Sequence, residues 1–175
     1  MSFSRAYFYF AMVVCLGAIQ GCATPANTAA MTVIEKPSKI NEKLRQSIII
    51  DSVAGGRETN PLWTSQVGTN GFRGALEGSL LSAGYLASNP SRAKYRLSAN
   101  LLELNQPMVG LTLDVKSNVL YQLKDDSGGV RGIPVSAVGV AGFSDAALAF
   151  ERLRIANERS IYENIKELLR QLSEQ

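Results

Sequence analysis

Alternation of apolar and polar residues predicts four β-strands. Residues 47–54 form a β-branched run that ends at two glycines, and this run predicts a central strand. Residues 95–104 and 111–124 are two long runs in which apolar and polar residues alternate, which is typical of antiparallel strands with one buried face. A turn sequence of aspartates and glycines leads into residues 130–141, a fourth strand that Pro134 places at a sheet edge or beside a bulge.

Two segments have the periodicity of helices. Apolar residues recur at helical spacing between residues 65 and 87, although four glycines lie there, at positions 68, 71, 74 and 78. An interior glycine costs up to about 1 kcal/mol relative to alanine, so we expect this glycine face to pack close to the sheet. A longer helix is expected to begin after Ser144 and Asp145, as its cap, and to end near Ser173.

The order of these elements is β-α-β-β-β-α. An alternation of this kind predicts an α+β fold in two layers. We therefore expect a four-stranded, mainly antiparallel sheet with two helices on one face.

The first 22 residues have the pattern of a lipoprotein signal. Arg5 precedes an apolar run over residues 7–18, which has the length of a signal-peptide core and is short for a membrane-spanning helix. The run leads into Ile19-Gln20-Gly21-Cys22, which resembles a bacterial lipobox. That resemblance implies cleavage after Gly21 and lipid on Cys22; the alternative is a plain secretory peptide with an incidental cysteine.

The residue after the lipidated cysteine bears on localisation. Ala23, and not aspartate, follows Cys22, which resembles an outer-membrane sorting signal of enteric-type bacteria. We expect a lipid-anchored protein on the periplasmic face of the outer membrane of a Gram-negative bacterium. Lipid chains stabilise such attachment by roughly 0.8 kcal/mol per buried methylene.

The mature chain divides into two parts after the signal peptide of residues 1–21. Residues 22–46 are small and polar with two prolines, which predicts a lipidated cysteine followed by a flexible tether. Residues 31–34 have an alternative interpretation as an added edge strand. Residues 47–175 are expected to form one periplasmic α+β domain.

Composition removes several classes of function. The 175 residues include no histidine and two cysteines, and the net charge is +3. Absence of histidine removes Ser-His-Asp and Cys-His catalysis and the commonest metal ligand, so no cofactor, metal site or catalytic residue is expected. Cys15 lies in the signal peptide, so the mature chain has no internal disulfide. No basic cluster indicates nucleic-acid binding.

The loop of residues 55–65 contains the only tryptophan, beside a proline and mixed charges. Trp63, with Arg57 and Asn60, is a candidate contact for a protein partner, a lipid or a glycan, because an indole offers a large contact area with little entropy to lose. In the alternative interpretation, Leu62 and Trp63 fasten the first helix to the core.

Asn157 and Asn164 are the candidate contacts on the final helix. They continue the line of Phe150 at heptad spacing, where apolar residues are expected. Such asparagines either fix the register against a partner helix or bond to a loop. Arg154 and Glu158 stand at i, i+4 and are expected to pair on a solvated face.

Two resemblances extend beyond the signal sequence. Residues 55–67, 105–107 and 151–158 are similar to proteobacterial lipoproteins often labelled UDP-N-acetylglucosamine acyltransferase. The enzymes of that name are β-helices with hexapeptide repeats and a histidine base, and this chain has neither. The architecture over residues 47–173 resembles lipopolysaccharide-assembly lipoproteins and auxiliary lipoproteins of ABC-type transporters, which provide no catalytic residues.

These observations lead to an ordered set of functional hypotheses. The first is a non-catalytic accessory lipoprotein that binds a protein partner in an envelope assembly or transport system. The second is a module that binds an envelope glycan or lipid. The third is an acyltransferase-like enzyme.

Overall fold

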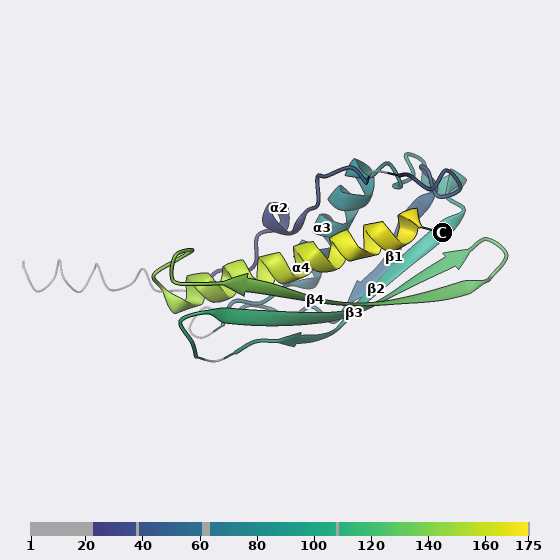
Figure 1. Cartoon of the computed structure of the whole chain (residues 1–175). Coiled ribbons are helices and arrows are strands. Elements are labelled where there is room, and N and C mark those ends of the chain that lie inside the picture. The colour runs from purple at the N-terminus through teal and green to yellow at the C-terminus, as the bar shows by residue number, and fades with distance from the viewer. Residues whose placement is uncertain (1–22, 38, 61–63, 108, 175) are drawn as a thin grey trace, which may run out of the picture.

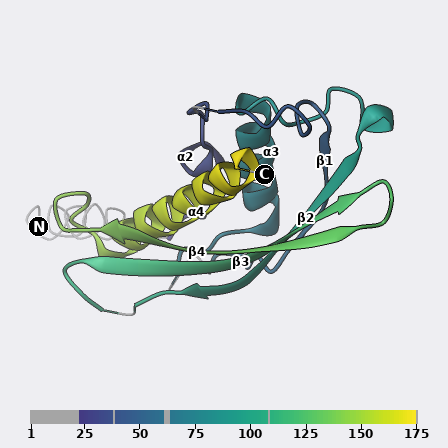
Figure 2. The same cartoon turned by 45° about the vertical axis from the view of Figure 1, so that its right-hand side comes forward.

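The computed structural model describes residues 23–37, 39–60, 64–107 and 109–174. One open sheet has the strand order β1-β2-β3-β4, in which β1 is parallel to β2 and the other pairs are antiparallel. The helices α3 and α4 pack on this sheet and form the second layer (Figures 1 and 2). The predicted two-layer α+β fold is thereby confirmed. The elements are, in chain order, α2 (Thr28–Met31), β1 (Ile48–Ala54), α3 (Thr69–Ser82), a 3-10 turn (Pro90–Arg92), β2 (Tyr95–Asn105), β3 (Leu113–Asp125), β4 (Val130–Ala141) and α4 (Ala149–Ser173).

The strand β1 lies at an edge of the sheet, although its β-branched run predicts a central strand. The outer edge of β1 is covered at its start by the segment after α3. Ile48 N–H donates to the Tyr85 carbonyl at 3.0 Å, and Ala87 N–H donates to the Ile48 carbonyl at 2.8 Å. The segment after α3 therefore pairs with the outer side of β1 at its start. The prediction from Pro134 holds, because β4 forms the opposite edge.

The described residues between 23 and 46, which are all but residue 38, include side chains buried in the domain, whereas the sequence predicted a flexible tether over residues 22–46. Met31 and Val33 are fully buried in the main core, and Val33 N–H donates to Ser79 Oγ at 2.9 Å. The short helix α2 occupies part of the segment for which an edge strand was the alternative. The polar composition is misleading because a few apolar side chains, Met31, Val33 and Leu44, fix the segment by reaching the core.

The glycine face of α3 explains how this segment fits. A Cβ added at Gly74 would lie 3.0 Å from Cγ2 of Thr28, and one added at Gly78 would lie 2.9 Å from Cγ2 of Thr32. The glycines therefore allow the α2 segment to pack closely against α3. The prediction was that they would allow close packing of α3 on the sheet. The loss of helix propensity at these positions is offset by this contact.

The helix α4 lies along β3 and β4 (Figure 2). A Cβ at Gly139 would lie 2.2 Å from the Ala156 carbonyl oxygen, so only glycine permits this approach between strand and helix. The helix begins at Ala149 and not after Ser144. Asp145 instead accepts from Gly142 N–H at 2.8 Å and pairs with Arg159 at 2.7 Å.

Substitution of Met31 tests whether residues 23–46 belong to the fold. Met31→Ala removes a fully buried side chain, so we expect the free energy of unfolding to fall by about 2–5 kcal/mol. Ile34→Ala, in the same segment but 76% exposed, is the matched control and should change it by less than about 0.5 kcal/mol. Urea unfolding measures both; equal small effects would mean that the segment is a tether.

Candidate functional site

Three connections meet at one end of the sheet, which we call the loop end. Their described residues are 55–60 and 64–68, then 106, 107 and 109–112, and then 142–148. They follow β1, link β2 to β3 and link β4 to α4, and parallel pairing of β1 with β2 brings the first two together. The opposite end carries the β3–β4 hairpin and the C-terminal end of α4 (Figure 1). The loop end contains Arg57 and Asn60, both exposed, whereas Trp63 lies outside the described residues.

The chain that follows the predicted lipidation site is fixed at the loop end. Ser65 Oγ donates to the Thr24 carbonyl at 2.7 Å, and Ala26 N–H donates to the Gln66 carbonyl at 3.1 Å. Ala23 is buried, and Cys22, which is bonded to it covalently, lies outside the described residues with Gly21. A lipid on Cys22 would therefore be attached next to this packed segment, with no free linker between them.

Ser65 is the centre of the polar contacts at this end. Its carbonyl oxygen accepts from Gln106 Nε2 at 2.9 Å and from Asn157 Nδ2 at 3.0 Å. Gln106 Nε2 also donates to Asn157 Oδ1 at 2.8 Å. These contacts join the loop before α3, the end of β2 and the middle of α4.

Neither asparagine of α4 reaches the surface. Asn157 and Asn164 are both fully buried within the chain, so the partner-contact interpretation of these two residues is not retained. Asn157 bonds to the Ser65 loop, as the alternative interpretation had it. Asn164 accepts from Tyr121 Oη at 2.9 Å and donates to the Val135 carbonyl at 3.2 Å, which fixes α4 on the sheet.

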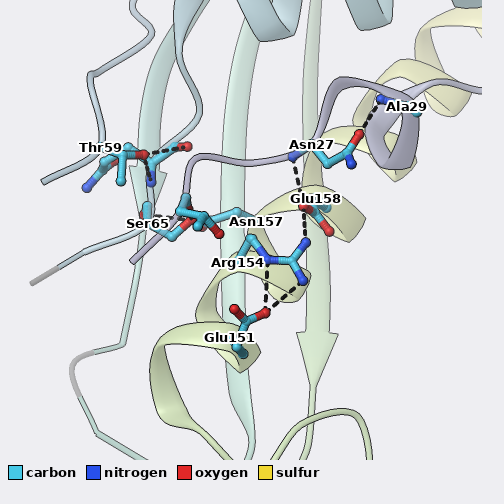
Figure 3. A network of polar contacts seen from close by, with 10 residues as sticks. Asn27, Ala29, Thr59, Ser65, Glu151, Arg154, Asn157 and Glu158 are labelled. Atoms are coloured by element: carbon cyan, nitrogen blue, oxygen red, sulfur yellow. Dashed lines mark hydrogen bonds and ion pairs between the residues drawn. The ribbon is translucent and has the colours of Figure 1, made fainter. Parts of the chain in front are cut away.

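An ionic network continues from Asn157 along α4 (Figure 3). Arg154 pairs with Glu151 at 2.8 Å and with Glu158 at 2.7 Å, and Glu158 Oε1 accepts from Asn27 N–H at 2.8 Å. Hydrogen bonds to Glu151 and Glu158 raise the pKa of the Arg154 guanidinium, and the bond to Glu151 has the larger effect. The predicted Arg154–Glu158 pair is present, but Glu158 is buried and holds the N-terminal segment, so this face is not merely solvated.

Backbone hydrogen bonds join the two described sides of the loop that follows β1, residues 55–60 and 64–67. Asn60 and Thr64 exchange N–H···O bonds at 3.2 and 3.1 Å, and Arg57 N–H donates to the Val67 carbonyl at 2.9 Å. Thr59 Oγ1 accepts from Gln66 N–H at 2.9 Å. Arg57 and Asn60 are both exposed.

Sequence reasoning missed Arg152 and the apolar loop residues around it. Arg152 is buried; its Nη1 donates to the carbonyls of Ala146 and Ala147 at 3.0 and 2.8 Å, and its Nη2 donates to the Gly110 carbonyl at 3.4 Å. Leu111, predicted at the start of a strand, precedes β3 and is exposed. The available signal was the near absence of charge in both connections.

The chemistry of the loop end is that of structural contacts. Its buried polar side chains bond to one another and to the backbone, which is typical of groups that fix a fold; Arg152 Nε is the exception among the described residues and is buried without a hydrogen-bond partner. Among the described residues, no three His, Cys, Asp or Glu side chains are grouped to hold a metal ion. In that same part of the chain, no helix combines the length and apolar character needed to span a bilayer.

Neither a protein-family model nor a curated protein matches this chain. Solved structures that resemble it include a DUF330-family protein from Xanthomonas campestris, 12% identical, with a TM-score of 0.49 over 77% of this chain and 90% of that one. A minor lipoprotein from Acinetobacter baumannii is 17% identical, with a TM-score of 0.44 over 73% and 93% of the two chains. Likenesses of this size carry no inference about function.

Removal of Asn164 tests its structural role. Asn164→Ala leaves the buried Tyr121 hydroxyl without this acceptor, so we expect a loss of about 1–3 kcal/mol in unfolding free energy. Adding Tyr121→Phe removes the stranded hydroxyl and should recover part of that loss. A double-mutant cycle by urea unfolding measures this coupling; strictly additive effects would contradict it.

Proposed function

We propose that this protein is a non-catalytic, lipid-anchored accessory lipoprotein on the periplasmic face of the Gram-negative outer membrane. In this proposal it binds a protein partner of an envelope assembly or transport system. Support for the anchor comes from the lipobox at Cys22, and support for a binding role from the free edge of β4. Partner binding is the proposal that the β4 edge favours over the glycan- or lipid-module hypothesis.

Within the described part of the chain, no strand pairs with the outer edge of β4. Asp125 N–H donates to the Gly129 carbonyl at 2.9 Å, which sets the alternation of the hairpin. The N–H and C=O groups that point away from β3 then belong to the even-numbered residues, and Arg159 Nη1 reaches one of them, the Val140 carbonyl, at 2.6 Å. Pro134 falls on an outward position, where its missing N–H removes no ladder bond.

An open groove runs along this edge beside α4. It has a volume of about 950 Å³ and is lined by residues 134–140 and by α4 side chains that include Arg159, Tyr162 and Glu163. Residues 132–141 contain no charge, and Val138 and Val140 are about half exposed. Charged residues commonly protect edge strands from pairing, and their absence here favours addition of an extended strand from a partner.

Two substitutions of Val138 distinguish the contribution of its backbone N–H to partner binding from that of its side chain. Val138→Pro removes one outward N–H and adds a ring at the edge, whereas Val138→Thr keeps the N–H with a side chain of similar shape. We expect the proline variant to weaken partner recovery roughly tenfold and the threonine variant to retain it. Cross-linked co-purification from membranes, read by quantitative mass spectrometry, measures both.

Thermal unfolding serves as the control for this comparison. Because the Val138 N–H does not pair with β3, both variants should keep a midpoint close to that of the wild type. Equal recovery of the same stoichiometric partner by both folded variants would contradict binding at the β4 edge.

A further inference from the structure

Four large apolar side chains are exposed together at the loop end. Val109 and Leu111 lie in the connection between β2 and β3, and Phe143 and Leu148 lie in the connection between β4 and α4. They expose 86%, 77%, 63% and 55% of their surface, respectively. We call these four residues the apolar tip. Grouped apolar exposure of this kind marks a contact with another molecule or with a membrane.

Arg152 holds the two connections of the apolar tip together. Its guanidinium donates to the Gly110 carbonyl on one side and to the Ala146 and Ala147 carbonyls on the other. Its Cζ also lies 5.6 Å from the centre of the Phe143 ring. The charge of Arg152 is thus directed inward, and the outward surface remains apolar.

The tip carries almost no charge. Residues 106–112 contain no charged residue, and residues 142–148 contain Asp145 alone. Both carboxylate oxygens of Asp145 accept hydrogen bonds, from Arg159 and from Gly142 N–H. These bonds hold the pKa of Asp145 below its ordinary value, with the bond to Arg159 as the largest cause. The negative charge of Asp145 is therefore balanced by the Arg159 guanidinium.

The N-terminal segment directs the predicted lipid to this same end. Asn27 N–H donates to Glu158 of α4, and the Thr24 carbonyl accepts from Ser65, which itself bonds to Asn157. From Asn27 to Thr24 the chain therefore runs toward the N-terminal end of α4. After the predicted cleavage, Cys22 is the only residue before the buried Ala23. The apolar tip and the attachment point of the acyl chains therefore belong to one end of the molecule.

We infer that the apolar tip inserts into the interfacial layer of the leaflet that holds the acyl chains of Cys22, and so fixes the orientation of the domain on the membrane. This inference rests on the lipid anchor of the proposed function. The acyl chains supply attachment, and the tip supplies orientation by burying apolar side chains at the boundary between headgroups and chains. The domain then stands on its loop end, and the β4 edge along its side stays accessible.

A depth measurement on the lipidated full-length protein tests this inference. Cleavage removes Cys15, and acylation blocks the Cys22 thiol, so a single introduced cysteine is the one free thiol. Val109→Cys carries an environment-sensitive fluorophore at the tip, and Leu81→Cys carries it at the far end of α3, also exposed. The protein is reconstituted into phosphatidylethanolamine–phosphatidylglycerol vesicles that contain a lipid quencher near the headgroups.

We expect quenching and a blue-shifted emission at position 109 and neither at position 81. Adding Phe143→Asp should reduce quenching at position 109 to the level at position 81, whereas Val130→Asp, exposed on the opposite end, should leave it unchanged. Both substitutions replace exposed side chains, and thermal unfolding verifies that the variants fold.

Three results would overturn the inference, and they differ in what else they affect. Unquenched label at position 109 on protein that is acylated and bound to vesicles would refute the tip contact and leave the anchor intact. A mature mass without lipid on Cys22 would remove the anchor and the inference together. Cross-linking of position 109 to a protein in cells, without quenching in vesicles, would assign the tip to a protein contact instead.

Discussion

The carbonyl and hydroxyl of Ser65 determine how the loop end is assembled. Through them the N-terminal segment at Thr24, the end of β2 at Gln106 and the middle of α4 at Asn157 meet at one buried residue. Each contact joins segments at least 41 positions apart, so none is supplied by local helix or strand formation. Buried polar groups must be bonded, and removal of one partner leaves the others unsatisfied. The position of the N-terminal segment, and hence of the proposed lipid on Cys22, depends on this group of bonds.

The helix α4 contributes one of those bonds, through Asn157, and is held on the sheet by further contacts. Gly139 allows its backbone to approach β4, and Asn164 bonds to Tyr121 and Val135 inside the sheet layer. Ser160 adds a bond to Ser117 at 2.8 Å. Buried polar contacts of this kind specify one register of the helix on the sheet. An apolar stripe alone specifies the register less strictly. The same helix borders the groove along β4 and places Arg152 at the loop end.

The strands and the overall fold are predictable from sequence because alternation reports burial of one sheet face directly. The position of β1 at an edge could not be predicted from sequence. Residues Tyr85–Ala87 cover the start of its outer side, and a covered edge strand has the same apolar pattern as a central strand. Composition does not predict the packing of the N-terminal segment, because that packing depends on Met31 and Val33 reaching the core and on Thr28 and Thr32 fitting against Gly74 and Gly78 of α3. Asn157 and Asn164 interrupt an apolar line, which identifies them as special but leaves open whether they bond within the chain. The apolar tip is not predictable from pattern, because Leu111 continues the strand alternation and exposure is set by where the strand ends.

The domain combines a packed N-terminal segment with the outer edge of β4, where no described strand pairs, and the proposed lipid is attached at its loop end. The central claim is that the chain after Cys22 is part of the domain. Hydrogen–deuterium exchange on the lipidated protein tests this claim most directly, at the amides of Ala26, Asn27 and Val33, which donate to Gln66, Glu158 and Ser79. The account predicts protection of these amides comparable to that of β3. Exchange at the rate of an unstructured peptide, while α3 and β3 stay protected, would contradict it.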